Sequence, residues 1–291
     1  MIATIGPCLP IDLLAATGRF TGPVSWQLDR PTPRADGWLE SRFPRWSRSI
    51  LEDWAQGRFD DLEMIVFSRG DDVAQRLYYY VCELQRRGIV GGPRPVIFDV
   101  AKIRRSTSED HTVASVRRLA AELGLDDAAL ASGIAATNER RKAGGTVAGA
   151  PACLLPGTPP PQDMLHQAIR DAGFAPVGPT LAELWSDPGP VVDTVGDPAD
   201  AIGRQVHARS NDARGFEDPI VRVAALAARH DAKAAVLWHT EEDEARIWVT
   251  PRVRSALAEA SVPTLVLTRR DEGGEDGAAA EIDAFLKGLE L

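Results

Sequence analysis

Two short polar turns in the sequence combine residue types that could carry chemistry. The first, Ser68-Arg69-Gly70-Asp71-Asp72, follows the apolar run Ile65-Val66-Phe67 and precedes a segment with helical spacing. The second, His239-Thr240-Glu241-Glu242-Asp243-Glu244, follows the apolar run 234–238. Because α/β proteins place their ligands at turns that lead from the carboxyl end of a buried strand, both turns are candidate functional sites.

The residue types in these turns favour acid–base or metal-assisted chemistry, because a histidine beside carboxylates can transfer protons or bind a divalent metal. The candidate catalytic residues are Asp71, His239 and Asp243. The candidate substrate-binding residues of the first turn are Ser68, Arg69 and Gly70. Each turn also has a structural alternative. The aspartates of the first turn can simply cap the following helix, and the acidic second turn can simply be solvated.

The composition is that of a globular protein with one large or two medium domains. The chain has 291 residues, of which 44% are hydrophobic and 26% charged, and a formal net charge of −9. This charge argues against nucleic acid or an anionic membrane as a partner of the whole surface. No apolar run approaches the roughly 20 residues that span a bilayer, and the first residues lack the basic region of a secretory signal. We therefore expect a cytoplasmic protein.

Sequence motifs for common cofactors are missing. The three cysteines, Cys8, Cys82 and Cys153, are far apart and have no CxxC spacing, so we expect free thiols and no self-sufficient metal site. The chain has no GxGxxG after its first strand and no GxxxxGK[ST]. A dinucleotide-binding or P-loop function therefore has no motif support.

Segments typical of strands and helices alternate along the chain, and this order occurs twice. We expect strands near residues 3–5, 22–26, 64–67, 96–100, 152–155, 234–238 and 264–268. Helices are expected between them, with residues 28–37 as a loop and a capping box at 106–109. Such alternation predicts an α/β fold of two Rossmann-like domains, with parallel sheets flanked by helices and a cleft between them. The expected domains are residues 1–147, including a helical segment at about 106–142, and residues 148–291.

The order of several segments resembles the 2-hydroxyacyl-CoA dehydratase and benzoyl-CoA reductase subunit family. The segments that carry the resemblance are IGPCLPIDLLAATG, FPRWSRSILEDW, MIVFSRGDDVAQRLYYYV, NERRK and AAVLWHTEEDEARIWVTPRVRSALAEASVPTLVLTRRD. They occur in the family's order and cover most of the chain except the region around 176–200. The resemblance implies the two-domain fold, work as pairs of homologous subunits, and dehydration or reduction of a CoA thioester through a ketyl radical.

The resemblance also implies a [4Fe–4S] cluster held by three cysteines, and the sequence departs from the family at those positions. The three ligand positions fall at Arg48, Gly70 and Asp243. None of these residues supplies the soft thiolate that holds an iron–sulfur cluster. If both domains keep the family arrangement, we expect Arg48 to pair with Asp71 or Asp243, or to receive an anionic group of a substrate.

The leading hypothesis is a divergent, cluster-less subunit that binds a CoA thioester or supports a cluster-bearing partner subunit, as a heteromer or homodimer. If the chain is active, the resemblance implies a lyase of the dehydratase type. A second hypothesis reuses the cleft for non-redox acid–base or metal-assisted chemistry. A third is a non-catalytic interaction protein.

Overall fold

The computed structural model describes residues 1–101, 103–142, 149–209 and 218–289, and divides the chain into two compact units. The first unit comprises residues 1–145 and 185–216, and the second comprises residues 146–184 and 217–291. The predicted boundary between residues 147 and 148 lies outside the described residues. Residues 185–216, the return segment, belong to the first unit. This differs from the predicted second domain, which contained all of 148–291.

Each unit contains a four-stranded parallel sheet, as the alternation of segments predicted. In the first unit the strand order is β2-β1-β3-β4, and the strands are β1 (Ile2–Ile5), β2 (Phe20–Pro23), β3 (Met64–Ser68) and β4 (Arg94–Phe98). Every residue of β3 is buried. A central strand covered on both faces has no need of alternating polar residues, which explains its continuous apolar run.

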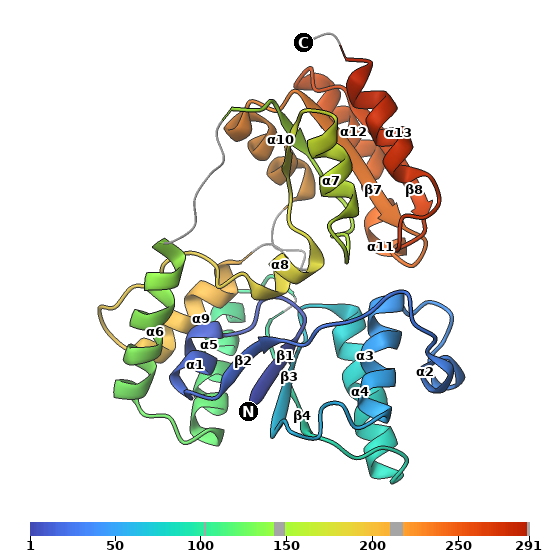
Figure 1. The fold of residues 1–291 in the computed structure, drawn as a ribbon. Coiled ribbons are helices and arrows are strands. Elements are labelled where there is room, and N and C mark those ends of the chain that lie inside the picture. The colour runs from blue at the N-terminus through green and yellow to red at the C-terminus, as the bar shows by residue number, and fades with distance from the viewer. Residues whose placement is uncertain (102, 143–148, 210–217, 290–291) are drawn as a thin grey trace. The chain divides into compact units, whose positions relative to one another are not determined.

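The helices of the first unit cover both faces of its sheet (Figure 1). They are α1 (Ile11–Ala16), α2 (Pro33–Trp38), α3 (Arg45–Ala55), α4 (Asp72–Arg86), α5 (Ser108–Glu122), α6 (Asp127–Lys142) and α9 (Pro198–Ala208). Val66 of β3 belongs to a core shared with α1, α5, α6 and α9. The next residue, Phe67, packs on the other face against Trp54 of α3 and Tyr78 of α4, with ring centroids 6.1 and 5.6 Å away.

The second unit repeats this design with the strand order β6-β5-β7-β8. Its strands are β5 (Ala152–Leu154), β6 (Ala175–Val177), β7 (Ala234–Thr240) and β8 (Thr264–Arg270). Val236 of β7 packs in a core with α7 (Met164–Asp171) and α13 (Ala278–Lys287). Leu237 packs in a separate core with α10 (Pro219–His230) and α12 (Thr250–Glu259). Successive residues of β7 thus reach opposite faces, as a doubly covered strand requires.

A buried polar network anchors the return segment to the first unit. Arg141, in the last turn of α6, forms a bidentate ion pair with Asp12 at 2.7 Å for both bonds, and the two side chains are 3% and 1% exposed. The same guanidinium donates to the carbonyl of Pro188 at 2.7 Å. Asn138 donates to the carbonyl of Val192 at 2.9 Å. These contacts, with the packing of α9 on α5 and α6, explain why a segment beyond the predicted boundary returns to the first unit.

The local structure departs from prediction at two places. The predicted loop 28–37 contains the start of α2, which begins at Pro33, because proline is favoured in the first turn of a helix. The predicted capping box is wrong. The hydroxyl of Ser108 accepts from the N–H of Arg105 and donates to the carbonyl of Ile103, in the turn before α5.

Two short helices complete the second half of the chain. They are α8 (Leu181–Ser186), within which the chain passes from the second unit to the first, and α11 (Glu244–Ile247) after β7. Within the described ranges, none of the helices has the length and apolar character needed to cross a membrane.

Candidate functional site

The first predicted turn lies at the topological switch point of its sheet. β1 lies between β2 and β3, so the chain winds away from it in both directions. Ligands of open parallel sheets bind beside the carboxyl ends of the two strands at such a point. Ser68 is the last residue of β3, and Gly70 and Asp71 follow it. The sequence therefore located these residues at the expected edge of the sheet.

Ser68 and Asp71 each accept a hydrogen bond from a backbone N–H close by in the chain. The hydroxyl of Ser68, a fully buried residue, accepts from the N–H of Gly70 at 3.0 Å. Asp71 is the N-cap of α4, and its Oδ1 accepts from the N–H of Ala74 at 2.7 Å. This is the structural role that the sequence offered as the alternative for Asp71. Its catalytic role stays a prediction.

The ends of β1 and β3 pack closely together beside Ser68. Gly6, directly after β1, has a φ of +96°, and a Cβ atom built on it would lie 2.8 Å from Cβ of Ser68 and 3.1 Å from Cβ of Ala74. Only glycine fits there. Arg69 points elsewhere and forms an ion pair with Asp99 after β4. The turn after β1 therefore packs closely against the end of β3 and the start of α4.

Arg48 lies on α3, and its guanidinium is held by nearby groups. It pairs with Asp36 at 2.8 Å and donates to the carbonyls of Glu40 at 2.6 Å and Phe43 at 3.1 Å. Its side chain is 15% exposed. The expected ion pair of Arg48 with Asp71 is wrong, because α2 and the residues after it supply a carboxylate and two carbonyls within reach of the same side chain.

The second predicted turn lies at the equivalent switch point, between β5 and β7. Asp243 accepts from the hydroxyl of Thr158, in the turn after β5, at 2.6 Å, and pairs with Arg246 at 2.6 Å. It also caps α11. Burial alone would raise the pKa of Asp243, but Arg246 and Thr158 together hold it below its ordinary value. Asp243 is therefore an ionised carboxylate that ties the two strand-end turns together.

His239 is the second candidate catalytic residue of this turn. It is 2% exposed, and its Nε2 lies 3.0 Å from the hydroxyl of Thr250, the first residue of α12. Its Nδ1 is screened from solvent and has no hydrogen-bond partner among the described residues. Burial lowers the pKa of His239, with a smaller opposing effect from Asp243. Burial thus favours the neutral form of the ring.

Gly157, in the turn after β5, packs closely against the backbone of this strand end. Gly157 has a φ of +117°, and a Cβ there would lie 2.2 Å from the carbonyl oxygen of Trp238 and 3.2 Å from Cε1 of His239. Within the ranges that the structure describes, no group of three or more His, Cys, Asp or Glu side chains could hold a metal ion. The metal-assisted version of the second hypothesis thus lacks a ligand set in this part of the chain.

A pocket of about 390 Å³ in the first unit contains one predicted residue, Arg48. Its lining consists of Leu28, Asp29, Arg30, Pro31, Thr32, Asp36, Arg45 and Arg48. We call it the three-arginine pocket. Arginine is the side chain best suited to bind carboxylate and phosphate groups. Arg48 thus lies in the lining of this pocket with its guanidinium already paired with Asp36, and its expected role in receiving an anionic group stays a prediction.

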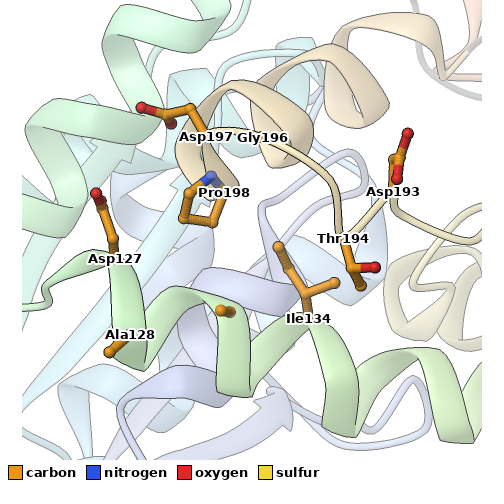
Figure 2. Close-up of a pocket in the computed structure, with 9 residues that line it drawn as sticks. Asp127, Ala128, Ile134, Asp193, Thr194, Gly196, Asp197 and Pro198 are labelled. Atoms are coloured by element: carbon orange, nitrogen blue, oxygen red, sulfur yellow. The ribbon is translucent and has the colours of Figure 1, made fainter.

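A second pocket of the first unit, of about 340 Å³, is acidic (Figure 2). Ile134 and Pro198 lie on opposite sides of the space between α6 and the segment that leads into α9, with Asp127 and Asp197 on one rim. Asp197 is already bonded to the N–H of Asp200 at 3.0 Å and pairs with Arg117 at 3.0 Å. No side chain that lines this pocket has a buried atom left without a hydrogen-bond partner.

Sequence reasoning missed Arg30 and Arg45 as neighbours of Arg48, and Thr158 and Thr250 as partners of the second turn. Arg30 lies in a segment that we expected to be a loop, and Arg45 is the first residue of α3. No sequence motif marks either arginine as a binding residue. Thr158 follows β5, and the parallel pairing of β5 with β7 brings it to the second turn. Thr250 begins α12, the helix that comes after α11 and the second turn in the chain. A signal did exist for Thr158, because it follows Gly157 at the end of a predicted strand.

No protein-family model matches the chain, and no curated protein matches it. These comparisons give the resemblance of the ordered sequence segments no support, and it stays a proposal.

Proposed function

We propose that the chain is a cluster-less subunit of a 2-hydroxyacyl-CoA dehydratase-like or aryl-CoA reductase-like system. It binds a CoA thioester or supports a homologous partner subunit that carries the cluster. The observation that carries the proposal is the ordered set of family-like segments with all three cysteine positions changed, to Arg48, Gly70 and Asp243. Two doubly wound units with the same strand order are consistent with that scaffold.

The local roles of the three replacement residues support the absence of a cluster in this chain. Gly70 has no side chain, Arg48 uses its guanidinium on Asp36, and Asp243 uses its carboxylate on Thr158 and Arg246. Iron–sulfur clusters need thiolate ligands, and Cys153 is buried with its pKa raised to about 12. A residue in such a state is a poor thiolate donor. The redox step therefore belongs to a partner.

Co-purification and ligand binding test this proposal together. The chain is expressed anaerobically with any homologous gene beside its own, and complex formation is measured by size-exclusion chromatography. Binding of a 2-hydroxyacyl-CoA and an aryl-CoA is measured by calorimetry, with free CoA as the control. We expect a stable pair, or thioester binding tighter than that of free CoA. If the chain shows no association and no thioester binding, the proposal is contradicted. Association without thioester binding would favour the non-catalytic interaction protein.

A second candidate function, non-redox acid–base chemistry, is favoured by the 3.0 Å contact between His239 and Thr250. A neutral histidine beside a hydroxyl can act as a general base. The test is release of free CoA from a CoA thioester by hydrolysis, compared between the wild type and His239→Gln. Equal rates, no faster than the uncatalysed reaction, would contradict this candidate.

A further inference from the structure

We propose that His111 is a nucleophilic imidazole that accepts an acyl group at its Nδ1 atom from an activated ester or thioester, with Asp99 as the residue that positions the ring. The inference does not rest on the proposed function. His111 lies in the first turn of α5, and Asp99 directly follows β4. Both therefore lie near the carboxyl edge of the first sheet, where α/β proteins place their functional groups.

The carboxylate of Asp99 fixes the orientation of the imidazole. Its Oδ2 lies 3.1 Å from Nε2 of His111, and its Oδ1 pairs with Nη1 of Arg69. An ionised carboxylate only accepts hydrogen bonds, so Nε2 faces it with its proton. The lone pair of the neutral ring is then on Nδ1. An aspartate holds the catalytic histidine of serine hydrolases in a defined tautomer by the same kind of contact.

His111 is also the histidine that a reagent can reach. Its side chain is 45% exposed, and it has no further hydrogen bond or ion pair among the described residues. Of the other four histidines, two are buried and two are half-buried, namely His166 and His239, and His207 and His230. The lone pair on Nδ1 is therefore open to an electrophile from solvent.

The charge beside the ring favours a neutral electrophile. Attack by Nδ1 turns the ring into a cation, which the contact with Asp99 stabilises. The N-terminus of α5 opposes such a cation, and Glu109 and Asp110 in the same turn offset that effect. These carboxylates would repel an anionic phosphoryl donor, whereas a neutral ester or thioester carbonyl meets no such repulsion.

The acyl transfer needs no further reactant except water. The lone pair of Nδ1 attacks the carbonyl carbon, and the bond to the leaving oxygen or sulfur breaks with its electron pair. The acylated ring is held as a cation beside Asp99 until its Nε2 proton passes to the leaving group. Water then adds to the acyl carbon, a carboxylic acid departs, and the ring regains its proton on Nε2. Histidine is one of the side chains that form such covalent intermediates.

Hydrolysis of p-nitrophenyl acetate, followed by release of p-nitrophenolate, tests the proposal on the full chain. The reaction per mole of His111 should be about fivefold faster than with N-acetylhistidine, the effect of one unit charge about 4 Å away in water. His111→Gln should lose most of the protein-dependent rate. His230→Gln is the matched control, because His230 lies in the second unit, and its rate should equal that of the wild type.

Two carboxylate variants separate the contact with the ring from the general field. Asp99→Asn should lower the rate about fivefold, because it removes the charge that touches Nε2. Asp110→Asn removes the same charge from the first turn of α5 without a contact to the ring, so it should lower the rate less. Equal rates in these two variants overturn the proposal, as does a wild-type rate no faster than that of N-acetylhistidine.

A labelling experiment on the wild type keeps the test independent of folding defects in the variants. Diethyl pyrocarbonate is a neutral acyl donor, and peptide mass spectrometry locates the histidine that it modifies. We expect His111 to be labelled first, and more slowly in Asp99→Asn. Labelling of His207 or His230 before His111, or at the same rate, overturns the proposal.

Discussion

Replacing Arg141 by methionine tests whether the buried network anchors the return segment. The substitution leaves the carboxylate of Asp12, 1% exposed, without its bidentate partner at 2.7 Å. It also removes the donor to the carbonyl of Pro188. Breaking a buried pair by removing one partner costs about 3–5 kcal/mol. That is a large part of the total of about 5–15 kcal/mol by which most proteins are stable.

Urea unfolding followed by tryptophan fluorescence measures the loss of stability in the first unit of the chain. Five of the seven tryptophans belong to the first unit, namely Trp26, Trp38, Trp46, Trp54 and Trp185. We expect Arg141→Met to lower the free energy of unfolding of this unit by about 3–5 kcal/mol. Limited proteolysis with thermolysin gives a second readout, because release of the return segment should expose new cleavage sites in it.

The matched control is Arg19→Met, which breaks an ion pair with Glu63 of 2.6 Å whose partners are 43% and 50% exposed. Exposed pairs contribute about 0.2–1 kcal/mol, so this variant should be near wild type. The double variant Asp12→Leu, Arg141→Met should lose less than the sum of its single changes, because no charge is then buried alone. A loss below about 1 kcal/mol in Arg141→Met, or one equal to that of Arg19→Met, would refute the anchoring role.

Three further changes test local parts of the account. In urea unfolding, Asp71→Ala should lower the free energy of unfolding by about 1 kcal/mol, and Asp71→Asn should lower it little, because either an aspartate or an asparagine can cap α4. Equal losses in the two variants would contradict a capping role. In the same assay, Gly6→Ala should lower the free energy of unfolding more than Gly88→Ala. Both glycines have a positive φ, but of these two only Gly6 has neighbours within 4 Å of a built Cβ. Equal losses would contradict the close packing around Gly6. Burial lowers the pKa of His239, so the stability that its neutral ring provides is present above the unfolded value of about 6.5 and is lost as the pH falls. The urea midpoint should therefore fall less between about pH 7 and pH 5 in His239→Gln than in the wild type, and equal falls would contradict this.

The fold could be predicted because its strands are covered on both faces. The continuous apolar runs 64–67 and 234–238 became β3 and β7. Successive residues of each strand pack on opposite faces of its sheet. The helices between them have clear end signals. For example, Asp126 accepts from the N–H of Ala129 at 2.8 Å, as its place before α6 predicted. The spacing of apolar residues and the capping residues of helices are both local features of the chain. They can therefore be recognised in a single sequence.

The partners of the site residues could not be predicted, because they depend on contacts between distant segments. Arg141 reaches Asp12 and the return segment across 129 and 47 positions, and nothing in the Pro-rich sequence around residue 188 indicates that it packs on α6. The strand-end rule correctly located the candidate turns. It did not reveal that Gly6 packs closely against Ser68 and Ala74, or that Gly157 packs closely against the backbone of Trp238.

Iron content tests the proposal that this chain has no cluster of its own. The chain is purified under strictly anaerobic conditions, alone and co-expressed with a homologous neighbour, and iron and acid-labile sulfide are measured in each. We predict neither element in the chain alone, and both in a stable pair, where the partner holds the cluster. Stoichiometric iron and sulfide in the chain alone would contradict the account, because Arg48, Gly70 and Asp243 supply no thiolate.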